Sequence, residues 1–103
     1  MNNEFSSIED FMAAISGKWL NPSTNTRFHF VTDTKQPGFG QVNIFQPEIK
    51  TPVVLNTSGK WRNKQVMLVV ENEYYEIAMM GSLVKSLFIT LSPDNVLHLV
   101  KKD

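Results

Sequence analysis

The chain has 103 residues, 42% of them hydrophobic, and its ten Lys and Arg residues balance ten Asp and Glu residues. This length suits one domain with a single modest core. A net charge of zero argues against a general nucleic-acid binder, which needs a basic surface. The absence of cysteine excludes disulfides, thiolate metal sites and a cysteine nucleophile.

The N-terminal stretch MNNEFSSIED has neither the basic region nor the apolar region of a secretory signal. The apolar runs are also much shorter than the ~20 residues that a membrane-spanning helix needs. We therefore expect a cytoplasmic protein with no membrane span. A secreted protein whose signal had been removed would give the same sequence.

The first predicted element is a helix over about residues 7–16. Ser6 or Ser7 can accept a hydrogen bond from the first turn and so cap the N-terminus. Gly17 lies where the positive φ that often follows a helix is expected. The apolar residues recur at i, i+3, i+4 and i+7 and form one stripe, which consists of Ile8, Phe11, Met12 and Ile15.

After Trp19 the apolar pattern changes from helical to twofold periodicity, which is typical of strands. Short strands are predicted over 26–31, 39–45, 53–57, 65–71, 74–80, 84–91 and 95–102, with turn-rich segments between them. No gap is long enough for a crossover helix, so the strands should be antiparallel and sequential neighbours. We predict a single domain over 1–103, mostly β. It is an antiparallel up-and-down meander of seven or eight strands over about 18–102, closed into a barrel, with one N-terminal helix.

The tetrapeptide SGKW occurs twice, at 16–19 and 58–61, and contains both tryptophans of the chain. The residues that follow the two copies diverge, which argues against a duplicated unit. We expect the same local device in both places. Glycine permits a positive φ that reorients the chain, and the tryptophan then anchors the next strand.

A helix followed by Gly17-x-Trp19 at the start of an antiparallel meander resembles the beginning of the lipocalin and calycin superfamily. The later segment ITLSPDNVLHL is similar to the closing hairpin of small bacterial lipocalin-like domains. This resemblance implies a barrel whose narrow end is closed by Gly17 and Trp19. Residues 95–103 contain lysines but no arginine, so the arginine that packs over this tryptophan in the family has no counterpart. The Arg-x-Tyr pair of fatty-acid-binding proteins is missing as well.

The alternation of residues 26–31 predicts Phe28 and Phe30 inside the barrel and Arg27 and His29 on the solvated face. A one-residue slip in register would turn Arg27 and His29 inward, where they could pair with a ligand carboxylate.

The leading functional hypothesis is non-enzymatic binding of a small lipophilic molecule inside the barrel, driven by removal of its apolar surface from water. The residues expected to line the cavity are Trp61, Phe30, Phe45, Met67, Tyr75, Met79 and Phe88. The alternative is a protein-interaction or structural module with a filled barrel core, in which an exposed patch recruits a partner or a second copy to form a homodimer. A continuous cavity of at least ~300 Å³ would favour the first hypothesis over the second.

Sequence motifs for enzymatic activity are missing: there is no nucleophile elbow, phosphate loop or zinc-protease motif. His29 and His98 are the only histidines, and neither has a clustered partner in the sequence. We expect no catalytic residues, no metal site and no cofactor. The acidic residues Glu71, Glu73 and Glu76 are expected to form a solvated surface that discourages strand addition.

Overall fold

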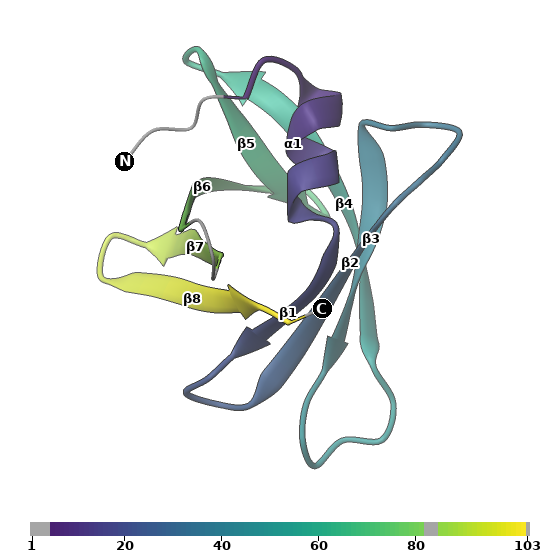
Figure 1. Cartoon of the computed structure of the whole chain (residues 1–103), viewed down its shortest axis with the longest axis vertical. Helices are drawn as coiled ribbons and strands as arrows, with labels where there is room; N and C mark the ends of the chain where they lie inside the picture. Colours follow the sequence, from purple (N-terminus) through teal and green to yellow (C-terminus); the bar gives the residue numbers. More distant parts are fainter. Residues whose placement is uncertain (1–4, 82–84, 103) are drawn as a thin grey trace.

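The computed structural model describes residues 5–81 and 85–102 and shows a closed eight-stranded antiparallel barrel with one helix (Figure 1). Its elements in chain order are α1 (Ile8–Ile15), β1 (Gly17–Asn21), β2 (Thr26–Thr32), β3 (Phe39–Phe45), β4 (Val53–Arg62), β5 (Gln65–Val70), β6 (Glu73–Met80), β7 (Ser86–Ser92) and β8 (Asn95–Lys101). Each strand pairs with the next one, and β8 pairs with β1. The predicted fold class is confirmed.

The helix α1 begins as its sequence predicts, because the Ser7 side chain accepts a hydrogen bond from the backbone N–H of Asp10. Its apolar stripe faces the barrel, and Figure 1 shows α1 on the concave side of the sheet that β1 to β5 form. Phe11, Met12 and Ile15 are at most 1% exposed and belong to the same core cluster as the barrel residues. The helix therefore fills part of the barrel interior. No helix among the described residues has the length and apolar character needed to cross a membrane.

The C-terminal end of α1 is tied to the barrel by Trp19 and Lys101. The Trp19 indole Nε1–H donates to the carbonyl oxygen of Ile15 at 2.8 Å, and the Lys101 ammonium donates to the carbonyl oxygen of Ser16. The same ammonium lies 4.8 Å from the centroid of the Trp19 ring. The sequence predicts no arginine-like partner for Trp19, but Lys101 on β8 supplies the cation, because Trp19 and Lys101 are paired across the β1–β8 ladder.

The two SGKW copies have different structural roles, so the expectation of one shared device is wrong. Gly17 has the predicted positive φ, at 116°. The second copy continues as part of β4, and Gly59 is not among the glycines with positive φ. A Cβ at Gly59 would lie 2.9 Å from Cδ2 of Phe11 and 3.0 Å from Cγ2 of Ile8. Glycine is needed here because α1 packs directly against β4.

Candidate functional site

The residues expected to line an apolar cavity are divided between the two faces of the barrel wall. Phe30, Tyr75 and Met79 belong to or pack against the core, as predicted. Tyr74, which precedes Tyr75, is on the outer face and is 41% exposed.

Phe45, Met67 and Phe88 lie on the outer face, contrary to the prediction that they line the interior. The register pairs them with Arg27, Lys60 and His98 respectively, whose side chains also face outward. The strands holding Phe45 and Met67 have apolar residues on both faces, so alternation alone did not identify the inner one. Phe88 instead stacks on the His98 ring, with centroids 4.5 Å apart and an interplanar angle of 8°.

Trp61 lies at the end of β4, near the rim of the barrel, and is 50% exposed. It shares the inner face of the strand with Gly59, because the side chains of a strand alternate between faces. Three surface depressions are described below. Of the residues expected to line a cavity, Phe45 alone borders one of these three depressions.

The barrel interior is filled by large side chains. Trp19, Leu68, Leu87 and Leu99 are at most 1% exposed, as are the three core residues of α1. Together they form one contiguous core cluster. Close packing of this kind leaves few voids larger than a water molecule. The surfaces that could contact a partner therefore lie on the outer wall.

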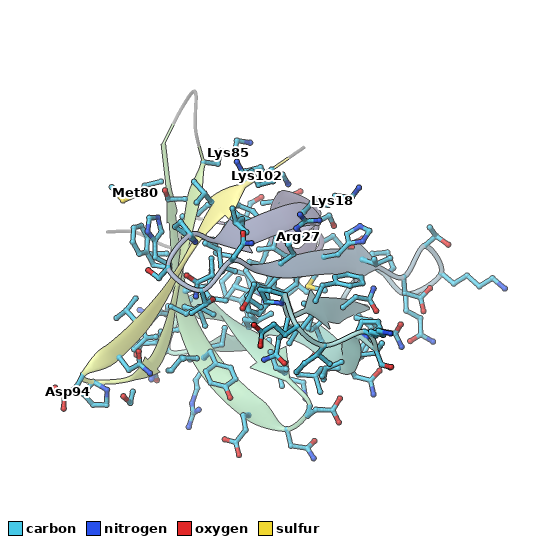
Figure 2. The ribbon with its side chains drawn as sticks, turned by 90° about the horizontal axis from the view of Figure 1, so that it is seen from below. Lys18, Arg27, Met80, Lys85, Asp94 and Lys102 are labelled. Atoms are coloured by element: carbon cyan, nitrogen blue, oxygen red, sulfur yellow. The ribbon has the colours of Figure 1, made fainter. Side chains whose placement is uncertain are left out.

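The largest of the three depressions, of about 590 Å³, lies on the outer wall around β1 and β2. We call it the basic depression. It is bordered by the cations Lys18, Arg27 and Lys102, and Figure 2 shows these three side chains on the same side of the barrel. Its remaining lining consists of Trp19, Leu20, Asn25, Phe28, His29 and Phe45.

The strand ladder brings these distant cations together. Lys18 pairs with His29 and Leu20 pairs with Arg27 across the β1–β2 ladder. The backbone N–H of Lys102 donates to the carbonyl oxygen of Lys18 at 2.8 Å, which places the C-terminal end of the chain beside β1. Arg27 and His29 thus face outward, as the alternation predicts.

No carboxylate of residues 5–81 and 85–102 borders the basic depression. Within residues 5–81 and 85–102, Lys18, Arg27 and Lys102 form no ion pair. The depression thus combines three cations with the apolar side chains of Leu20 and Phe45. This combination is complementary to an anionic group that carries an apolar side chain.

The outer wall carries a hydrogen-bonded serine–histidine pair. Ser86 Oγ and His98 Nε2 form a hydrogen bond of 3.0 Å, but the pair is exposed and borders none of the three depressions. Among the described residues, His98 donates no hydrogen bond to a carboxylate. The described residues also contain no group of three or more His, Asp or Glu side chains that could hold a metal ion.

Sequence reasoning did not identify Lys18 and Lys102 as members of a site. The prediction of a closed barrel could have indicated them, because closure places the first and last strands side by side and so brings the two ends of the chain together. The comparisons with known proteins add no further assignment, because the chain matches no protein-family model, no curated protein and no solved structure.

Proposed function

We propose that the protein is a non-enzymatic protein-interaction module, whose basic depression binds an acidic segment of a partner protein. The observation that carries this proposal is the cluster of Lys18, Arg27 and Lys102 around the apolar side chains of Leu20 and Phe45, with no carboxylate bordering it among the residues that the structure describes. The chain has no net charge overall, so these cations represent a local concentration of charge rather than a general basic character.

The filled interior supports an interaction module over a carrier of lipophilic molecules. A carrier would need a cavity inside the barrel, where Phe11, Met12 and Trp19 already pack. The basic depression is open to solvent. It therefore suits an exposed segment of a partner protein better than a small molecule that must be enclosed. An apolar side chain of the partner would contact Leu20 and Phe45 while neighbouring carboxylates approach the cations.

The resemblance to the lipocalin and calycin superfamily stays a proposal about ancestry. The cation of Lys101 over Trp19 supports it, since this is the arrangement that the family builds with arginine. The functional proposal does not depend on that resemblance, because it is based on the outer wall.

The test uses a fluorescein-labelled peptide of alternating Glu and Leu, with binding followed by fluorescence anisotropy. The double charge reversal Lys18→Glu with Lys102→Glu should weaken binding at least about tenfold, a change of about 1.4 kcal/mol. Added salt should weaken binding to the native protein, because exposed charges are screened.

A matched control reverses two exposed lysines in loops, Lys35→Glu with Lys50→Glu, which lie outside the basic depression. This control has the same net charge as the test variant and should bind the peptide as the native protein does. Equal weakening by both double variants would mean that net charge alone matters, and would contradict the proposal. A native protein that does not bind the peptide would contradict it too.

A further inference from the structure

We propose that the outer wall of β2 to β6 carries a second binding site, a groove for an uncharged saccharide chain. Two depressions, of about 430 and 380 Å³, share Phe39, Asn56 and Thr57 as lining residues. The two depressions therefore adjoin at these shared residues, and together we call them the Phe39 groove. None of its lining residues borders the basic depression.

An aromatic row crosses the groove from strand to strand. The register aligns Phe39 with Ser58, Ser58 with Val69, and Val69 with Tyr74. The two rings at the ends of the row are half exposed, at 52% for Phe39 and 41% for Tyr74, whereas Ser58 and Val69 between them are 8% and 4% exposed. The rings therefore stand above a floor of two smaller, closely packed side chains.

The Tyr74 ring has a cation–π partner on the same outer face. The Arg62 guanidinium lies 4.9 Å from the ring centroid, where it interacts with one face of the ring. β5 lies between β4, which carries Arg62, and β6, which carries Tyr74, so the pair spans the outer face of β5. A contact that favours one ring orientation lowers the conformational entropy lost when a ligand packs on the ring.

A polar row runs beside the aromatic row. Gln41 pairs with Asn56 across the β3–β4 ladder, and the Glu71 backbone N–H donates to the carbonyl oxygen of Asn56 at 2.8 Å. The Asn56 backbone N–H donates to Glu71 Oε2 at 2.6 Å, and Gln41 Nε2 donates to Asn56 Oδ1 at 3.4 Å. The second carboxylate oxygen of Glu71 and the remaining amide groups are exposed donors and acceptors.

The two rows together match the two surfaces of a sugar. A pyranose ring presents C–H groups on its faces, which pack on aromatic rings, and hydroxyl groups at its edge, which bond to amides and carboxylates. Neighbouring strands lie ~4.8 Å apart, which is close to the rise of one residue in an extended 1,4-linked saccharide. Successive strands can therefore contact successive sugar residues.

The charge of the lining favours an uncharged saccharide. Asp33 and Glu71 are partly balanced by Lys60, so the groove lacks the concentrated charge of the basic depression. An extended peptide would need separate apolar pockets for alternate side chains. The floor of Ser58 and Val69 is too closely packed to provide them.

The test records amide chemical shifts of the isotope-labelled protein during titration with cellotetraose, chitotetraose or maltotetraose. At least one of these should shift the resonances of the Phe39 groove. Phe39→Ala and Tyr74→Ala should each weaken that binding about 5- to 10-fold, because each variant removes a ring that packs on the sugar.

Phe45→Ala is the matched control, because it removes an equally exposed ring from the basic depression instead. It should leave saccharide binding unchanged, whereas Phe39→Ala should leave binding of the acidic peptide unchanged. The two proposed binding sites can therefore be confirmed or contradicted independently of each other. The proposal would be overturned if none of the three saccharides shifted the resonances of the Phe39 groove. Equal weakening of saccharide binding by all three variants would also overturn it. So would a groove that bound an extended uncharged peptide but none of the saccharides.

Discussion

Lys101 shows how a single side chain can stabilise the closure of the barrel. Its ammonium donates to the carbonyl oxygen of Ser16 and lies over the Trp19 ring, while its alkyl chain passes beside Gly17. A Cβ at Gly17 would lie 2.5 Å from the Lys101 Nζ atom, so the first glycine of the chain also makes room for this lysine.

Lys101→Met should lower the free energy of unfolding by about 2 kcal/mol. The variant keeps the apolar chain but loses a charged hydrogen bond and a cation–π contact. Lys102→Met is the control, because Lys102 is exposed, and it should change the free energy of unfolding by less than about 0.5 kcal/mol. Urea unfolding of both variants measures the difference, and equal effects would mean that the Lys101 contacts contribute nothing.

For Thr57 we expect the opposite effect on the free energy of unfolding. Its hydroxyl is buried and has no hydrogen-bond partner among the described residues. A buried hydroxyl without a partner loses its hydrogen bonds to water on folding. Thr57→Val has nearly the same shape, so it should raise the free energy of unfolding by about 1 kcal/mol. Thermal unfolding followed by circular dichroism would show this as a higher Tm, and a lower Tm would mean that the hydroxyl has a partner in solution.

At the scale of the elements, the contact between α1 and β4 determines how the barrel interior is filled. The helix is short, and helices of this length are marginal in isolation, so its stability comes from packing. Gly59 allows Phe11 and Ile8 to approach the β4 backbone. The second SGKW is thus a close-packing site within a strand, not a turn.

Gly59→Ala should lower the free energy of unfolding by about 1–3 kcal/mol, because the added methyl group overlaps Phe11, which is fully buried and has no space to move. Gly38 offers a matched control. A Cβ there would lie 3.5 Å from Cγ2 of Ile8, an ordinary contact, so Gly38→Ala should be tolerated. Chemical unfolding of the two variants tests this, and equal stability of both would show that α1 is not packed as described.

At the scale of the whole molecule, the filled interior is the reason for proposing an interaction module and not a carrier of lipophilic molecules. The fully buried side chains come from α1 and from strands on both sides of the barrel, so the interior is one packed core. Several exposed apolar side chains lie instead on the outer wall, where Phe39 and Phe45 belong to different depressions.

The native protein should therefore leave the fluorescence of two uncharged lipophilic probes, N-phenyl-1-naphthylamine and Nile red, nearly unchanged. Neither probe should quench Trp19, which is fully buried, although Trp61 is exposed and can respond to a probe on the surface. A Trp61→Phe variant isolates the Trp19 signal. Saturable quenching of Trp19 by either probe would contradict the filled core and restore the carrier hypothesis.

The sequence by itself predicted the helix, seven or eight strands and their antiparallel order, because apolar periodicity and turn residues act over a few positions along the chain. It also placed Phe30 inside and Arg27 outside, since alternation within a strand depends only on neighbours. Where both faces of a strand carry apolar residues, as around Phe45, local pattern could not choose the inner face. Only the tertiary structure decided that α1 fills the interior, that Lys101 covers Trp19 and that Lys18 lies beside Lys102, because these contacts join parts of the chain that are far apart in sequence and meet only when the barrel closes.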